Sequence, residues 1–209
     1  MGQTVDIGTR IELVPMDPHF HEITIGLYRQ EYDGAPVYRV HTYSGRAGAD
    51  QRIAFVSNAM VVLGGMAQTP DGLLRFPCGE AHELACRRVF LEACKLASGG
   101  ELKTRPLTIV DRKSGLNITV SRAGSGEYRV EAAGEGKDAA RRISAIAGGL
   151  VKLGEMQSRS PDTVAFSCGH DHDAVVGLLL VRAPNVRAAV REQETSGARG
   201  VLAAPSQQR

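Results

Sequence analysis

The chain has 209 residues, a formal net charge of +2, 43% hydrophobic residues and 23% charged residues. These values are typical of a globular protein and exclude a disordered or fibrous class. The positive charges are spread along the chain, aromatic residues make up 5% and tryptophan is absent. Since nucleic-acid binding usually needs a basic stripe or stacking aromatics, we expect no nucleic-acid partner.

The apolar segments are short. The longest uninterrupted one, Leu178–Val181 with Val175 and Val176 before it, is far too short to cross a bilayer. The first ten residues lack the pattern of a secretory signal. We therefore expect no membrane contact and a cytoplasmic location, where the four cysteines would be thiols or ligands rather than disulfides.

A repeated motif is the most informative feature of the chain. Phe76–Glu83 and Phe166–Asp173 both read F-x-C-G-x-x-H followed by an acid, 90 positions apart. The same offset relates further residues on either side. These pairs are Tyr38 and Tyr128, Arg39 and Arg129, Val40 and Val130, Arg52 and Arg142, Ile53 and Ile143, Val61 and Val151, Leu63 and Leu153, Gly64 and Gly154, and Met66 and Met156. This self-similarity predicts a tandem duplication with pseudo-twofold symmetry.

The repeat also divides the chain. We expect a first repeat unit over 1–98, a linker over 99–106, a second repeat unit over 107–191 and a flexible C-terminal tail over 192–209. A unit of this size leaves much of its surface unburied and is only marginally stable alone, so the two should share a core.

Alternating apolar and polar residues begin the first unit. They predict three half-buried strands, over 10–14, 21–28 and 36–43, with an Asp33-Gly34 hairpin turn between the last two.

Helical periodicity follows these strands. Asp50 is the expected cap of a helix, and its inner stripe should be Ile53, Val56, Met60 and Leu63. A short strand over 73–76 and a second helix over about 80–97 complete the unit.

The second unit repeats this order. Its strands are expected over 107–110, 116–121, 127–132 and 163–166. Its first helix should bury Ile143, Ile146, Leu150 and Leu153, and its last helix should run over about 172–183. Each unit thus reads β-β-β-α-β-α, which predicts an α+β fold of antiparallel-rich sheets with helices on one face. Either the sheets or the helix layers of the two units would meet.

The last helix is unusually apolar. Ala174–Val181 carries no charge, and a helix that is apolar all round must be covered on all sides. Two interpretations stay open. The helix lies between the two units, or it is the surface through which the chain forms a homo-oligomer or binds a partner protein.

Both motif cysteines fall where a strand gives way to a helix. The positive end of a helix dipole there favours a thiolate, and Gly79 and Gly169 allow a tight turn. His82 and His172 follow one helical turn after the cysteines, so each imidazole can reach back. The simpler alternative is that these cysteines only fill space, because a duplicated gene also repeats its structural residues.

A metal site is the first functional hypothesis. Cys78, His82, Cys168 and His172 offer two thiolates and two imidazoles, the ligand set of a tetrahedral zinc site. His170, two residues after Cys168, is a further candidate ligand. This hypothesis requires the pseudo-twofold axis to bring the two motifs together.

Proton transfer by paired thiols is the second hypothesis. Cys168-Gly169-His170 resembles the C-G-H motif of proline racemase, a member of the cofactor-independent amino-acid racemases and epimerases. The resemblance implies that Cys78 and Cys168 are the catalytic acid and base. The glycine-rich continuation of that family's motif is replaced here by 171–173 and 80–82.

The preferred interpretation is a non-catalytic binding or assembly protein that associates through the apolar last helix, with the paired motifs as its candidate metal centre and zinc as the candidate ion. An isomerase or epimerase with two thiols as acid and base is the alternative, so the chain is not assigned to the enzymes on sequence alone.

Overall fold

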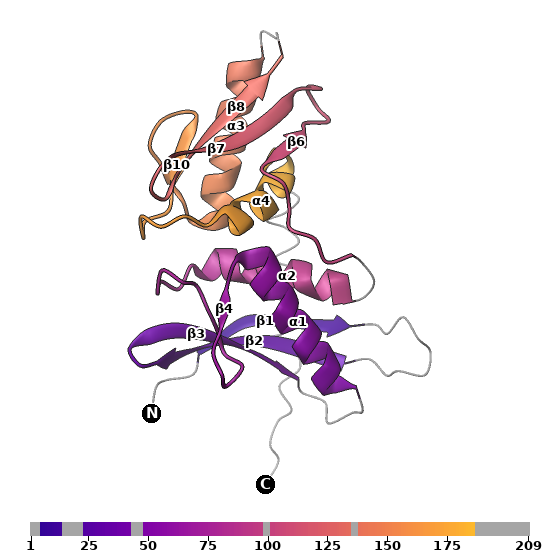
Figure 1. Ribbon diagram of the computed structural model, residues 1–209. Helices are drawn as coiled ribbons and strands as arrows, with labels where there is room; N and C mark the ends of the chain where they lie inside the picture. The colour runs from indigo at the N-terminus through magenta and orange to yellow at the C-terminus, as the bar shows by residue number, and fades with distance from the viewer. Residues whose placement is uncertain (1–4, 14–22, 43–47, 98–100, 135–137, 187–209) are drawn as a thin grey trace.

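The computed structural model describes residues 5–13, 23–42, 48–97, 101–134 and 138–186 (Figure 1). Over these ranges the fold is α+β, with two five-stranded antiparallel sheets and four α-helices. The α+β class predicted from the sequence is confirmed. The expected tail over 192–209 lies outside the described residues, as does the start of the expected linker.

The first sheet has the strand order β1-β2-β3-β5-β4. Its strands are β1 (Val5–Leu13), β2 (Ile23–Tyr32), β3 (Ala35–Thr42), β4 (Ala67–Gln68) and β5 (Leu74–Arg75). Strands β2 and β3 form a hairpin whose turn residues, Asp33 and Gly34, have φ values of 51° and 74°. Two positive φ values in a row are the conformation that Asp-Gly favours in hairpins. Helices α1 (Ala49–Gly64) and α2 (Glu83–Ala97) complete this first half of the chain.

The second sheet has the corresponding order β6-β7-β8-β10-β9. Its strands are β6 (Thr108–Val110), β7 (Asn117–Gly124), β8 (Glu127–Ala133), β9 (Gln157–Ser158) and β10 (Thr163–Ala165). Helices α3 (Ala139–Gly154) and α4 (Asp173–Arg182) belong to this second half, and a 3-10 turn, η1 (Ala183–Asn185), follows α4. Strands β4 and β9 were not predicted from the sequence, because each has only two residues and closely follows a helix, where no separate periodicity is visible.

The helix layers of the two halves face each other, and the sheets lie outside them (Figure 1). Across this junction α4 packs against α1 and α2, and α2 also packs against α3. Helix α4 is buried from Val175 to Leu180, and Val181, at 46%, is its one largely exposed residue. Coverage within the chain accounts for this apolar helix, so it gives no separate indication of an oligomer. None of the described helices is both long and apolar enough to span a bilayer.

The predicted helix stripes form much of the core. Val56, Met60 and Leu63 of α1 are fully buried, and Ile53 is partly buried against the same cluster. In α3, the corresponding residues Ile146, Leu150 and Leu153 are buried and Ile143 is again partly buried. One connected hydrophobic cluster includes residues of both halves, as expected for units too small to be stable alone.

Helix starts differ from the sequence prediction. Gly48, rather than Asp50, occupies the N-cap position of α1, and Asp50 lies in the first turn. Helix α2 begins at Glu83 instead of about residue 80, because Gly79 and His82 both have positive φ, at 81° and 44°. A residue with positive φ cannot continue a right-handed helix.

A buried ion pair fixes α3 to the loop after β6. Asp111 is 1% exposed and accepts hydrogen bonds from Nε and Nη2 of Arg142, both at 2.7 Å. Burial raises the pKa of Asp111, but hydrogen bonds from Arg142 and Ser114 outweigh burial and lower this pKa to about 2. Because the folded pKa lies below the unfolded value, the carboxylate stabilises the fold at neutral pH and loses this effect as the pH falls toward 2.

We predict that Asp111→Asn lowers the free energy of unfolding at pH 7 by about 3 kcal/mol, since it leaves the Arg142 charge without its partner. Urea denaturation at pH 7 and at pH 3 measures this, and the difference from the wild type should shrink at the lower pH. Glu127→Gln is the control, because the Glu127–Arg159 pair is exposed at 3.8 Å and should contribute under about 1 kcal/mol. Equal effects of the two substitutions would contradict the assignment.

Candidate metal centre

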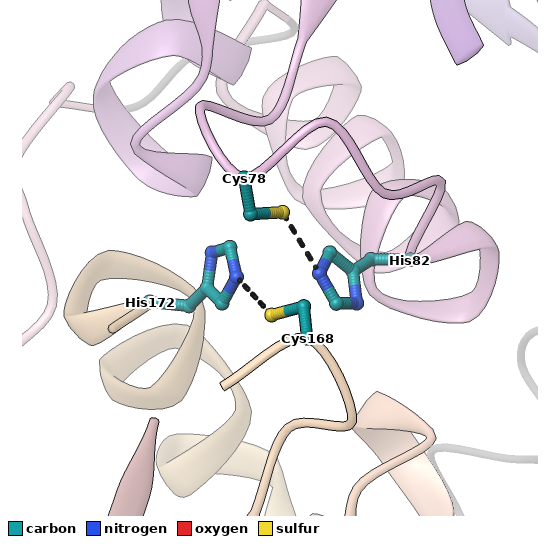
Figure 2. A group of neighbouring side chains, drawn as sticks. All are labelled: Cys78, His82, Cys168 and His172. Carbon is teal, nitrogen blue, oxygen red and sulfur yellow. Dashed lines mark hydrogen bonds between the residues drawn. The ribbon is translucent and has the colours of Figure 1, made fainter. Parts of the chain in front are cut away.

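Four side chains from the two halves converge at the junction between the helix layers. Cys78, His82, Cys168 and His172 each direct one ligand atom inward, and these atoms all lie within 4.8 Å of one another (Figure 2). The two motifs therefore lie next to each other in space, as the metal hypothesis requires. His172 is buried, and the other three side chains are partly buried.

A tight turn at the end of a short strand positions each cysteine. The Gly79 N-H donates to the Phe76 carbonyl at 3.0 Å, and the Gly169 N-H donates to the Phe166 carbonyl at 3.2 Å. Both glycines have positive φ, at 81° and 68°, which glycine adopts without the steric cost of a Cβ. The turn reverses the chain and leaves the preceding cysteine pointing toward the other half.

Each histidine is the last residue before a helix. The His82 carbonyl accepts the Cys86 N-H at 2.8 Å, and the His172 carbonyl accepts the Val176 N-H at 2.9 Å. The cysteines accordingly precede the helices, as expected from the sequence, but α2 begins five residues after Cys78 rather than about two. The N-H groups that reach the sulfurs, each at 3.4 Å, come from the turn residues Glu80 and His170.

Within each motif the cysteine contacts its own histidine. Sγ of Cys78 lies 3.2 Å from Nε2 of His82, and Sγ of Cys168 lies 3.3 Å from Nε2 of His172 (Figure 2). The two imidazole rings also contact each other across the junction, with ring centroids 4.6 Å apart. All four candidate ligands thus belong to one cluster that neither half contains by itself.

Two phenylalanines form the apolar wall of the cluster. Phe76 meets the ring of His172 edge-on at 5.6 Å, and Phe166 meets the ring of His82 edge-on at 5.2 Å. Each also contacts the histidine of its own half, at 5.2 Å for Phe76 and 4.7 Å for Phe166. These contacts restrict the orientation of both imidazoles and exclude water from one side of them.

Two fully buried tyrosines support the loops from behind. The Tyr38 hydroxyl donates to the Ala81 carbonyl, next to His82. The Tyr128 hydroxyl accepts the N-H of His172 and lies 3.0 Å from the Asp173 carboxylate. In the sequence, Tyr38 and Tyr128 stand out only as members of the repeat, and nothing there marks either residue as part of the site.

An arginine in each half holds the acid that follows the histidine. Nη1 of Arg29 lies 3.2 Å from Glu83, and Nε of Arg122 lies 3.0 Å from Asp173. In the strand register, Arg29 is opposite Tyr38 and Arg122 is opposite Tyr128. Sequence comparison missed this correspondence because the two arginines are 93 positions apart, whereas the motifs are 90 apart. Only the strand pairing reveals it.

The protonation of the cluster follows from its burial. Burial lowers the pKa of His82, and burial together with the neighbouring His82 and His170 lowers that of His172 to about 4. Both imidazoles are therefore neutral at pH 7, which is the form that binds metals. Burial, with the nearby Cys168, raises the pKa of Cys78 to about 11. Without a cation beside it, this thiol is not an activated nucleophile.

The remaining candidate ligand from the sequence, His170, lies outside the four-residue cluster, and so do the other two cysteines. His170 is exposed, and its Nδ1 lies 2.8 Å from the Cys168 carbonyl oxygen. Cys86 and Cys94 are fully buried in α2, as expected for cysteines that fill space.

The donor set and its spacing fit a zinc ion. Zn-S bonds of about 2.3 Å and Zn-N bonds of about 2.0–2.1 Å place the ligand atoms of a tetrahedral site about 3.3–3.8 Å apart. The Cys-His separations of 3.2 and 3.3 Å are close to that range, and no separation exceeds 4.8 Å. Small side-chain adjustments are enough to form a tetrahedron.

A scan against protein-family models, a search of curated proteins and a search of solved structures found no match to this chain. Function is therefore inferred from the chemistry of the site.

The turn glycines provide a stability test. A Cβ at Gly169 would meet no atom within 4 Å, so Gly169→Ala should act only through its positive φ and cost about 1–2 kcal/mol. A Cβ at Gly148 would also meet no atom within 4 Å, but this residue lies inside α3. Gly148→Ala should therefore raise the free energy of unfolding by about 0.5–1 kcal/mol. Thermal denaturation in a chelating buffer compares the two without a metal contribution. A stabilising Gly169→Ala would contradict the turn conformation.

Proposed function

We propose that the chain is a non-catalytic binding or assembly protein in which one zinc ion, held by Cys78, His82, Cys168 and His172, joins the two halves. The observation that carries the proposal is the convergence of these four ligand atoms within 4.8 Å, two from each half. A metal bound by ligands from both halves links elements that are far apart in the sequence. The zinc ion would therefore stabilise the packing of one half of the chain against the other.

We further propose that the halves, 1–98 and 107–191, arose by tandem duplication and are related by a pseudo-twofold axis. Equal strand orders in the two sheets support this, and so do contacts that recur at an offset of 90. A Cβ on Gly64 would touch Val89 and Met66, and one on Gly154 would touch Leu179 and Met156. The Tyr38–Phe76 ring contact at 6.4 Å likewise corresponds to Tyr128–Phe166 at 6.2 Å.

Contacts across the junction support the axis more directly. Gly65, which caps the end of α1, approaches Ala174 at the start of α4. Glu155, which caps the end of α3, accepts a hydrogen bond from the N-H of Leu84 at the start of α2, at 3.3 Å. Exchanging the halves converts the first contact into the second. Such an axis would pass through the cluster, so both copies of the motif would supply the same ligands to one ion.

The zinc proposal fits the geometry better than paired-thiol acid-base chemistry does. A carbon that exchanges a proton with a thiol on each face needs sulfurs about 6–7 Å apart, because reacting atoms approach to about 3–3.5 Å. The sulfurs of Cys78 and Cys168 are no more than 4.8 Å apart, which leaves space for an ion but not for a substrate carbon. The raised pKa of Cys78 also opposes its use as a thiolate base without a metal.

The chemistry of the site also supports a reducing compartment such as the cytoplasm, because thiolates remain available to zinc only where they are not oxidised. Under this proposal the two glycine turns, the two tyrosines and the two arginines serve to hold the four ligands before the metal arrives. A site preformed in this way loses less conformational entropy when it binds the ion.

Metal content tests the proposal. The purified full chain should contain about one zinc per molecule by elemental analysis. Cobalt(II) substitution should produce a thiolate-to-cobalt charge-transfer band and the intense visible absorption of a tetrahedral site. Cys168→Ser and His82→Ala should each lose most of the metal, because each removes one of four ligands.

Two matched controls separate ligands from neighbours. His170→Ala removes an exposed histidine two residues from a proposed ligand, and Cys94→Ala removes a buried thiol remote in sequence from the motif. Both should retain one zinc per chain. Absence of zinc from the wild type, or equal metal content in Cys168→Ser and His170→Ala, would refute the site.

A further inference from the structure

We infer that Cys78 and Cys168 are a modification site. Under oxidation they form a reversible disulfide across the two halves and thereby release the metal. This inference rests on the proposed zinc centre and adds a means of regulating it. The ligand set contains two cysteines that come from different halves, so their oxidation removes both thiolates from the ion at once.

The separation of the two sulfurs permits the bond. They lie within 4.8 Å of each other, and a disulfide needs about 2.05 Å between them. The sulfurs must therefore approach by less than about 3 Å, which rotation about χ1 and a small shift of the turns can supply. The Gly169 turn is held by Ser125, whose hydroxyl donates to the Gly169 carbonyl at 2.7 Å. At the Gly79 turn, a Cβ built on the glycine would meet no atom within 4 Å, so the shift would come mainly from the Cys78 side.

Solvent access distinguishes this pair from the other two thiols. Cys78 and Cys168 are partly exposed, whereas Cys86 and Cys94 are 0% and 1% exposed. A small oxidant can therefore reach the cluster without unfolding the chain, but it cannot reach the thiols inside α2. Buried structural cysteines are inert for this reason, so the chain contains its own internal control.

The oxidant of the proposed reaction is hydrogen peroxide. One thiolate attacks a peroxide oxygen, the S-O bond forms, the O-O bond breaks, and hydroxide leaves and takes up a proton. The second thiolate then attacks the sulfenic sulfur, the S-S bond forms, and a second hydroxide leaves and takes up a proton. Two electrons pass from the thiolates to the peroxide. Two water molecules are produced, and Zn²⁺ departs because a disulfide is a poor ligand.

The exchange replaces one link between the halves by another. Zinc joins residues 78–82 to 168–172 in the reduced chain, and a covalent bond between positions 78 and 168 joins the same segments in the oxidised chain. The packing of the halves would then survive the loss of the metal. Transient disulfides of this kind in a reducing compartment are characteristic of redox sensing.

Peroxide treatment of the zinc-loaded full chain tests the inference. A chromogenic chelator records zinc release, and peptide mapping after alkylation of the remaining thiols identifies the disulfide. We expect about one zinc released for each Cys78–Cys168 disulfide formed, with Cys86 and Cys94 recovered as alkylated thiols. Dithiothreitol and added zinc should restore the starting state.

Two variants sharpen the test. The double variant Cys86→Ala and Cys94→Ala should release zinc and form the cross-link as the wild type does. Cys168→His keeps four potential ligands but lacks the second thiol, so it should form no disulfide within the chain. If one variant does not fold, peptide mapping of the wild type still decides which sulfurs have joined.

The outcomes separate the two proposals. If zinc stays bound in peroxide, this inference is overturned and the zinc centre stays intact. The same holds if zinc is released while Cys78 and Cys168 are oxidised separately to sulfinic acids. A disulfide that includes Cys86 or Cys94 overturns this inference as well. A chain that never binds zinc overturns the proposed function, and the release step falls with it.

Discussion

The meeting of two glycine turns between the helix layers is the constraint on which the rest of the structure depends. Each turn ends a short strand, points a cysteine at the other half and delivers a histidine to the start of a helix. If either turn were displaced, His82 and His172 would not contact each other and the two phenylalanine walls would lose their partners. The buried helix α4 lies at the same junction, so the core and the candidate site share one geometry.

The halves support the cluster by the same means but with different residues. Glu83 is held by Arg29 and Arg87, whereas Asp173 is held by Arg122 and contacts the hydroxyl of Tyr128. A carboxylate in the first turn of a helix is favoured by the helix dipole, and its arginine ties the helix start to the neighbouring strand. Glu83 and Asp173 thus have the same mechanical role although the two acids and their partners differ.

Much of the fold was predictable because its signals are local. Period-two alternation and the Asp33-Gly34 turn predicted the β2-β3 hairpin, and the stripe from Ile53 to Leu63 predicted the buried side of α1. What the sequence could not decide was which layers meet. The uncharged helix at 174–181 is compatible both with a junction inside the chain and with an interface between chains. An apolar helix surface indicates that it is covered, but it does not indicate which part of the chain, or which other chain, covers it.

The candidate site was predictable to a similar degree. Repetition of the F-x-C-G-x-x-H motif marked Cys78, His82, Cys168 and His172, because these residues recur while the residues at the x positions differ. Their supporting tyrosines and arginines were not assigned, since the hydroxyl and guanidinium contacts depend on strand pairing between segments of unequal loop length. His170 could not be separated from the other ligand candidates by spacing alone, whereas in the structure it faces solvent.

Zinc-edge X-ray absorption on the full chain, as purified and fully loaded, tests the central claim most directly. A shared zinc centre should show two sulfur ligands at about 2.3 Å and two nitrogen ligands at about 2.0–2.1 Å from a four-coordinate ion. A first shell made only of oxygen and nitrogen, or one with a single sulfur, would show that the two motifs do not share one metal.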